Sequence, residues 1–502
     1  MKRTTLSLIA CATVLAAVTG LAAVSAPDDS GPDTATPAAR LPVERTSLLC
    51  PAPSTSDLAE TAYTSFTPVT KGADEKGGAA LVAAEPADAT DDGKDEKKDE
   101  KDGKDEKPVV RPKAPGTPVD GKTTGADAPA LIGTAEGNTA PGWTVQQTTE
   151  VAAGTGRGLQ GVNCTAPDTE FWFPGASTAS GRTDYVHLTN PDDSAAVVDI
   201  ELYGKDGALK STVGEGVTVP PHGSESLLLS TLSDVKQTDL TVHVGVRSGR
   251  LGAAVQALDD KTGGDWLTAA AAPASDLVMP GIPKDATAVR LVLFTPGGTD
   301  ADLKVRLASP SGLITPAGHE TVHVKAGMTT GVDLGEVTRG EAGSLVLTPT
   351  DRSVPVVAAL RVVRGKGDEQ ESAFIPASEP VGARATAADN RAKHTTLALS
   401  APDGAAKVKV TASAGTEGGT PATKTYTLEA GTTQNVEAPV PAGLKGSYAL
   451  TVETVSGGPV HASRTLTGSD DDVASFTVQT LPDDRGTVSV PNADEDLSVL
   501  QK

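Results

Sequence analysis

An internal repeat is the feature that most constrains how this chain can fold. Three copies of about one hundred residues each follow one another after residue 170. Their opening segments, 171–175, 277–281 and 373–377, read FWFPG, LVMPG and AFIPA. Repeats on the scale of whole domains build length and surface. The repeat therefore predicts an architecture and does not identify a substrate.

Within the copies, apolar and polar residues alternate with period two, for example at 198–203, 303–307 and 448–452. Turn sequences such as Lys-Asp-Gly and Pro-Asp-Gly separate these stretches. Short strands with frequent turns are typical of antiparallel β-sandwiches. We therefore predict an all-β protein of tandem immunoglobulin-like β-sandwich modules. The predicted boundaries are 171–262, 275–366 and 372–468, followed by extra C-terminal strands and a tail at 475–502.

A fourth, N-terminal module is predicted from weaker similarity to the copies. It would consist of residues 40–70 and 141–166, split by a disordered low-complexity insertion at 71–140. Residues 91–107 hold nine acidic residues and six lysines, and such a stretch buries too little apolar surface to order. Cys50 and Cys164 lie in the two halves of this module, and we predict that they form a disulfide.

The N-terminus predicts export. Lys2 and Arg3 precede an apolar run from Leu6 to Val24, which is the pattern of a signal peptide or a membrane anchor at residues 1–26. Cleavage and retention both remain open. Cys11 lies inside this segment, so that Cys50 and Cys164 are an even pair in an oxidising compartment.

Charge and composition limit the partners. A formal net charge of −22 argues against nucleic acid and against an anionic membrane surface, since both require a basic face. Aromatic residues make up only 3% of the chain, which is a small supply for sugar-stacking platforms.

Three motifs match catalytic or ligand-binding patterns by letters. His319, Glu320 and His323 fit the zinc-protease pattern, but that chemistry needs a helix. The surrounding Pro316, Gly318 and β-branched residues favour a strand, on which residues four apart lie about 13 Å from each other. Residues 156–161 fit a dinucleotide fingerprint inside a predicted hairpin, and paired aspartates near module junctions are weak calcium candidates. We expect no catalytic residues, no resident metal and no cofactor.

One aromatic cluster is unusual for this composition. It consists of Trp143, Phe171, Trp172, Phe173 and Trp266. Packing between modules is the favoured interpretation, and a binding patch for a glycan or a lipid is the alternative.

The chain also resembles an uncharacterised family of secreted or membrane-anchored actinobacterial proteins, a domain of unknown function. The resemblance is carried by the export segment from Arg3, by Leu49-Cys50-Pro51, by Arg157-Gly158-Leu159 leading into Cys164, and by Trp172-Phe173-Pro174-Gly175. It implies a location in the cell envelope and supplies no catalytic residues.

These observations predict a non-catalytic extracytoplasmic protein, structural or binding, of the bacterial cell envelope. Its partner would be a cell-wall or surface glycan or another envelope protein, with membrane contact through an uncleaved N-terminal segment. The alternatives are an accessory subunit of a membrane glycosyltransferase or secretion system, and a metal-dependent hydrolase built on His319 and His323.

Overall fold

The computed structural model describes residues 38–74, 76–86, 107–211, 213–468 and 475–490. The chain divides into two compact units, Met1–Leu41 with Ser489–Lys502 and Pro42–Val488. Two strands, β1 (Ala39–Pro42) and β38 (Thr487–Val490), pair in a two-stranded sheet. The predicted N-terminal helix, residues 1–26, lies outside the described residues. Among the helices in the described part, none has the length and apolarity to cross a membrane.

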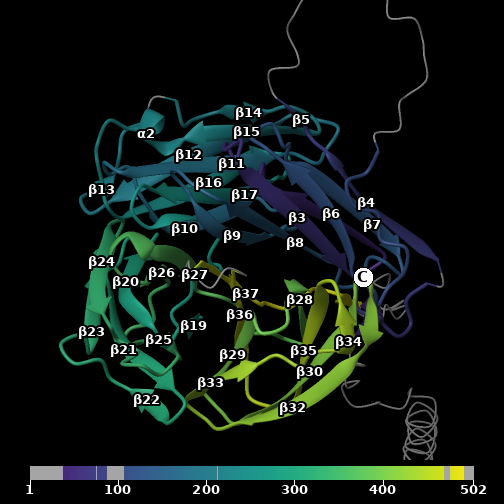
Figure 1. Ribbon diagram of the computed structural model, residues 1–502. Coiled ribbons are helices and arrows are strands. Elements are labelled where there is room, and N and C mark those ends of the chain that lie inside the picture. Colours follow the sequence, from purple (N-terminus) through teal and green to yellow (C-terminus); the bar gives the residue numbers. More distant parts are fainter. Residues whose placement is uncertain (1–37, 75, 87–106, 212, 469–474, 491–502) are drawn as a thin grey trace, which may run out of the picture. The chain divides into compact units, whose positions relative to one another are not determined.

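The larger unit contains four modules of two β-sheets each (Figure 1). Module 1 comprises β2 (Arg45–Cys50), β3 (Ala59–Phe66), β4 (Gly77–Ala83), β5 (Glu85–Pro86), β6 (Val119–Thr124), β7 (Leu131–Gly137), β8 (Thr144–Val151) and β9 (Gly158–Asn163). Module 2 comprises β10 (Glu170–Ala176), β11 (Arg182–Thr189), β12 (Ala196–Gly204), β13 (Gly207–Ala208), β14 (Val217–Val219), β15 (Gly223–Leu228), α2 (Leu229–Leu232), β16 (Leu240–Ser248), β17 (Gly252–Asp259) and β18 (Gly263–Leu267).

Module 3 comprises β19 (Leu277–Ile282), β20 (Ala286–Phe294), β21 (Ala301–Ser309), β22 (Gly312–Ile314), β23 (Thr321–Val324), β24 (Thr329–Gly335), β25 (Gly343–Pro349), β26 (Val357–Arg364), the 3₁₀ turn η2 (Gly367–Glu369) and β27 (Glu371–Pro376). Module 4 comprises β28 (Arg384–Asn390), β29 (Thr395–Ala401), β30 (Ala406–Gly415), β31 (Gly418–Thr420), β32 (Ala422–Leu428), β33 (Thr432–Glu437), β34 (Ala442–Lys445), β35 (Tyr448–Gly457), β36 (His461–Thr467) and β37 (Phe476–Thr480).

The strand order is shared by all four modules. One sheet, the opening sheet, contains the first strand of the module, as in β19-β25-β21-β22 with β23 also on β21. The other, the closing sheet, ends on the last strand, as in β24-β20-β26-β27. Modules 1, 2 and 4 have closing sheets β6-β3-β8-β9, β18-β17-β11-β15-β5 and β33-β29-β36-β37. In module 2, the short β5 from module 1 adds a parallel strand at the edge of β15.

The predicted all-β class is confirmed, and the paired sheets are consistent with a β-sandwich; the strand order agrees with the immunoglobulin pattern only in part. In immunoglobulin domains the first two strands share a sheet and the last two share the opposite one with the central strand. Here the last two strands, β26 and β27, share a sheet with β20, whereas the first two, β19 and β20, lie in different sheets. Strand count and turn spacing predicted a sandwich correctly because they report local pattern; they carry no information about which strands pair.

Alternation along each strand builds the sandwich cores. In β21, Leu303, Val305 and Leu307 are buried, whereas the residues between them are exposed. These side chains meet Leu291 and Leu293 from β20 in one apolar cluster between the two sheets of module 3. Period-two burial is expected where one face of a sheet packs on a core and the other faces solvent.

The prediction of disorder over the whole insertion 71–140 is wrong. Residues 77–83, 119–124 and 131–137 form β4, β6 and β7, which pair inside the two sheets of module 1. Leu81 and Leu131 are fully buried in its core. The stretch rich in Asp and Lys, 91–107, lies almost wholly outside the described residues. The alanine, glycine and threonine residues near it are small residues that form strands here.

The third repeat copy starts one strand later than the sequence suggested. Its presumed opening segment, 373–377, lies in β27, which pairs with β26 and so closes module 3. The first strand of module 4 is β28, which pairs with β35. Likewise β37 pairs with β36 and completes module 4. The closing strand β27 reads as an apolar run ending in proline, as the opening strands β10 and β19 do, which explains the shift.

Within this unit the modules contact one another in a closed cycle. The closing strands β9, β18, β27 and β37 pack each against the next, and β37 packs against β9. The opening strands β2, β10, β19 and β28 contact β17, β26, β36 and β8 of the following module in the same cyclic order. Module 4 is thus joined to module 1 although they are the most distant modules in the sequence.

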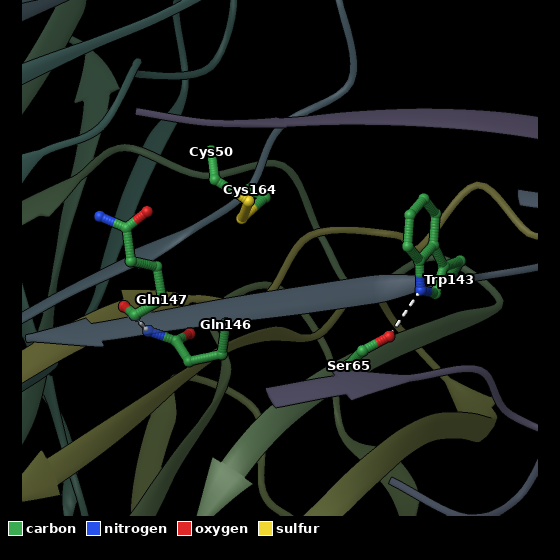
Figure 2. Close-up of a disulfide and its surroundings, with 6 residues drawn as sticks. All are labelled: Cys50, Ser65, Trp143, Gln146, Gln147 and Cys164. Carbon is green, nitrogen blue, oxygen red and sulfur yellow. Dashed lines mark hydrogen bonds between the residues drawn. A yellow bond between two sulfur atoms is a disulfide. The ribbon is translucent and has the colours of Figure 1, made fainter. Parts of the chain in front are cut away.

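The predicted disulfide is confirmed. Cys50 at the end of β2 is bonded to Cys164 just after β9, with Cα atoms 4.4 Å apart (Figure 2). It ties the first strand of module 1 to its last strand. Disulfides are typical of oxidising compartments, so it points to an extracytoplasmic location.

Removing this bond is expected to destabilise the protein strongly. The bonded cysteines are 114 residues apart, and closing such a loop in the unfolded chain is worth on the order of 4–5 kcal/mol. Urea unfolding of the double variant Cys50→Ala/Cys164→Ala should show a loss approaching that size, and reduction of the unchanged protein should reproduce it. An unchanged unfolding midpoint would contradict the estimate.

Candidate functional site: a buried polar junction of four modules

Asp265 on β18 is the centre of the junction between the closing strands. Its side chain is 1% exposed. The backbone N–H of Gly161 in module 1 donates to Oδ1 at 3.0 Å, and the Thr477 hydroxyl in module 4 donates to the same carboxyl at 3.0 and 3.1 Å. One carboxyl group of module 2 therefore binds the closing strands of two other modules, β9 of module 1 and β37 of module 4.

Glu371 on β27 brings module 3 to the same junction. Its side chain is 3% exposed, and Oε2 accepts the backbone N–H of Phe476 from module 4 at 3.3 Å. Oε1 has no hydrogen-bond partner among the described residues. Module 1 approaches through Gly158, where an added Cβ would lie 2.6 Å from Oε1. Glycine is required at this approach.

From Asp265 a buried hydrogen-bond chain runs into module 4. Gln479 Nε2 donates to the Thr477 hydroxyl at 2.6 Å, and Arg464 Nη2 donates to Gln479 Oε1 at 2.5 Å. Arg464 Nη1 then donates to the backbone oxygen of Asp389 at 2.8 Å. The Arg464 side chain is fully buried. Buried polar groups of this kind are costly unless bonded, so each member fixes the position of the next.

Electrostatics at the junction follow from burial. Loss of solvent raises the pKa of Asp265 well above its usual range, and the nearby Glu371 raises it further. Burial also raises the pKa of Glu371 to about 7, against the opposing charges of Arg157 and Arg364. The pKa of Arg464 falls to about 10 for the same reason. The junction can hold or release protons near neutral pH, and its geometry clamps four strands together.

Next to the junction lies one small cavity between modules 1 and 2. Asn163, His187, Thr189 and Ala254 are among its lining residues, and its volume is about 10 Å³, enough for one water molecule. His187 Nδ1 is 2.9 Å from the Ser226 hydroxyl, and burial lowers the pKa of His187 to about 4. A neutral, buried histidine beside a water-sized space favours a structural role.

The five aromatic residues of the predicted binding patch do not form a surface. All are buried, and they fall into different clusters. Phe171 and Phe173 belong to the core of module 2. Trp172 packs between modules 2 and 3 against Phe294. The neighbours Phe171, Trp172 and Phe173 are separated in space because successive strand residues point to opposite faces, and the burial of all five rings agrees with packing, the favoured interpretation.

The other two members lie near the disulfide and the junction. Trp143 is part of the module 1 core, where its Nε1 donates to the Ser65 hydroxyl at 2.8 Å (Figure 2). Trp266 packs on Val162 and Ala254 between modules 1 and 2. Both rings thus serve packing.

The zinc-motif residues do not converge. His323 lies on β23 with its Nδ1 2.8 Å from Asp302 Oδ1, whereas His319 and Glu320 precede the strand. Glu320 accepts the backbone N–H of Gly318 at 3.0 Å. Throughout the described ranges, no group of three or more His, Cys, Asp or Glu side chains is arranged to hold a metal ion.

Comparison with known families identifies the family of this chain. A sequence profile of a family of unknown function, DUF5719, matches residues 119–439, more than half of the chain. The chain belongs to the DUF5719 family. Among curated proteins, a sequence search finds no match.

The DUF5719 match covers β6 to β33 and includes three of the four closing strands, β9, β18 and β27. Sequence reasoning did not single out Asp265, Glu371, Thr477 or Arg464. One signal was present: Asp265 is an acid within a short run of small and apolar residues, and Glu371 begins such a run, where a strand buried on both faces is expected to be uniformly apolar.

Replacing Gly161 by alanine should overpack the junction. An added Cβ would lie 2.4 Å from Gln479 Nε2 and 2.7 Å from Thr477 Cγ2, and we expect a loss of about 1–3 kcal/mol in unfolding free energy. Gly78→Ala on β4 is the matched control, because nothing lies within 4 Å of its added Cβ. Equal urea midpoints for the two variants would contradict the predicted close packing.

The pKa of Glu371 predicts a pH dependence of stability. Because this pKa rises from 4.5 to about 7 on folding, the folded state binds the proton more tightly. The contribution of this proton binding to the free energy of unfolding is present in full below about pH 4.5. It is lost as pH rises through 7, by up to about 3 kcal/mol. Asp265 acts with the same sign.

Glu371→Gln should therefore flatten the fall in unfolding free energy between pH 5 and pH 8. The exposed neighbour Glu369 offers the control, since Glu369→Gln should keep the profile of the unchanged protein. Urea titrations at the two pH values measure both. A Glu371→Gln profile as steep as that of the unchanged chain would be inconsistent with this assignment.

Proposed function

We propose that this protein is a non-catalytic extracytoplasmic protein, structural or binding, of the bacterial cell envelope. The supporting observation is a polar strand face that recurs in modules 2, 3 and 4. The central strands β12, β21 and β30 of the opening sheets each alternate buried residues with exposed or half-buried polar ones.

These faces carry charged side chains of both signs. β12 presents Glu201, β21 presents Lys304 and Arg306, and β30 presents Lys407. The cycle of module contacts and the buried junction hold the three sheets in fixed positions within the unit. A frame that repeats a polar strand face in the same place of each module suits binding to a partner that is itself repetitive, such as a polymer.

Localisation supports the same proposal. The disulfide Cys50–Cys164 favours a compartment outside the cytoplasm. The apolar run Leu6 to Val24 behind Lys2 and Arg3 favours export, with residues 1–26 forming a cleaved signal helix or a retained membrane anchor. We further infer an actinobacterial origin, with the protein secreted or anchored.

The partner we favour is a cell-wall or surface glycan. Side chains on β21 can donate hydrogen bonds to hydroxyl or anionic groups of such a polymer. An envelope protein docking on the same faces is the other possibility. A role as accessory subunit of a membrane glycosyltransferase or secretion system would require retention of residues 1–26, which the intact mass of the mature protein reports.

Cosedimentation with isolated cell walls tests this proposal. We expect saturable binding of the purified chain that is lost when secondary polymers are stripped from the walls. Arg306→Glu on the exposed face of β21 should weaken binding by a factor of a few. Arg352→Glu reverses the same charge in an exposed loop and should leave binding unchanged.

Absence of binding to intact and stripped walls at two salt concentrations would rule out the glycan partner. Crosslinking in native membranes would then identify a protein partner, and a specific crosslink to a glycosyltransferase or secretion component would favour the accessory-subunit alternative.

A further inference from the structure

The four module boundaries are not equivalent. The chain passes directly from module 1 to module 2, from 2 to 3 and from 3 to 4, so three boundaries are held by the backbone as well as by packing. The fourth boundary, between modules 4 and 1, is closed only by non-covalent contacts. We call this boundary the seam.

Large apolar side chains fill the three boundaries that the chain crosses. Module 1 meets module 2 through Trp266 packed on Val162. Phe374 of module 3 enters the core of module 2, and Phe476 of module 4 enters the core of module 3. Each buried aromatic side chain contributes on the order of 2–3 kcal/mol.

At the seam the apolar contact is small. It consists of Phe66 on β3 against Ala388 and Ala449 of module 4. Cross-strand pairing places Gln146 and Thr148 of β8 on the same face of the sheet as Phe66. Both side chains are buried.

These two polar side chains are poorly satisfied. Within the described residues, Gln146 Oε1 and Thr148 Oγ1 have no hydrogen-bond partner. A buried polar atom without a partner costs roughly 1–3 kcal/mol, which exposure to water would return. Opening the part of the seam between β28 and β8 would therefore relieve this cost.

A C-terminal segment bridges the seam. Residues 482–486, which we call the strap, follow β37. Asp484 forms an ion pair with Arg384 of β28, in which the two side chains are 7% and 15% exposed. Arg384 also donates to the Thr70 hydroxyl at 3.0 Å and to the backbone oxygen of Pro141 at 3.3 Å, both in module 1.

The strap also contacts module 1 directly. The backbone N–H of Val43 donates to the Gly486 oxygen at 3.1 Å. Gly142 has a φ of +73°, and an added Cβ there would lie 2.5 Å from Asp484 Oδ2. The strap is thus fitted closely against both sides of the seam.

From this geometry we propose that the seam between modules 4 and 1 opens while the other boundaries stay closed, with the strap as its latch. Opening separates β28 from β8 and exposes Gln146 and Thr148 to solvent, whereas Asp265 keeps its bonds to β9 and β37. The Arg384–Asp484 pair holds the closed form. This inference does not depend on the proposed function.

Thiol labelling of the full chain tests the proposal. In a Cys11→Ser background the native disulfide leaves one introduced thiol free. Ala449→Cys reports the seam, and Ala359→Cys reports the boundary of modules 2 and 3; both alanines are buried. Under native conditions, maleimide should label position 449 faster than position 359.

Asp484→Asn should accelerate labelling at position 449 by about tenfold, equivalent to one 1.4 kcal/mol step, and leave position 359 unchanged. Asp239→Asn is the matched control. It breaks a similar pair with Arg290, whose Nη2 lies 2.5 Å from Asp239 Oδ2 between modules 2 and 3, and should not affect position 449.

Two outcomes would overturn the proposal. Equal labelling rates at the two positions would show that exposure requires global unfolding, and parallel acceleration at both by Asp484→Asn would show the same. If Asp484→Asn fails to fold, Arg384→Lys is the second variant. Lysine keeps the positive charge but lacks the guanidinium group that contacts Asp484, Thr70 and Pro141 together. Selective acceleration of labelling at position 449 is again the expected result.

Discussion

The buried carboxyl of Asp265 is the interaction on which the arrangement of the modules depends. Its partners, the Gly161 N–H and the Thr477 hydroxyl, come from modules 1 and 4, so no single module satisfies it. Leaving such a group unpaired in a dry interior costs several kcal/mol. Modules 1, 2 and 4 must therefore be assembled together before this cost is offset, and Glu371 adds the same requirement for module 3. The unit is expected to fold as an interdependent whole.

Apolar packing reinforces this dependence. Phe374 and Phe476 lie in closing strands, yet each contributes to the core of the preceding module. The sequence repeat and the cooperative folding unit are therefore different. Module 3 excised at its boundaries would expose its own Phe374 and would lose the Phe476 ring from its core. This explains why the modules resemble separate domains in sequence while their cores interlock in the structure.

Sequence pattern predicted the sandwiches because alternation in strands such as β21 is local. It predicted the Cys50–Cys164 bond because exported cysteines pair. It could not predict strand order, since β19 and β20 read alike whether or not they share a sheet. It misjudged residues 107–140, where small side chains form β6 and β7 with little hydrophobic signal. The sequence pattern could not predict the junction, because Asp265, Glu371 and Thr477 are each more than 100 residues apart and meet only when the cycle of modules closes.

The disulfide has a mechanical consequence. It joins the end of β2 to the residue after β9, so tension applied between the N-terminal segment and module 2 passes through the sulfur bond. The residues between the two cysteines, including the long run of aspartate, glutamate and lysine, lie outside this load path. A break in the chain between the two cysteines would therefore leave the N-terminal segment covalently joined to module 2. A disulfide that carries tension past the intervening residues suits a protein that is held at one end and pulled at the other.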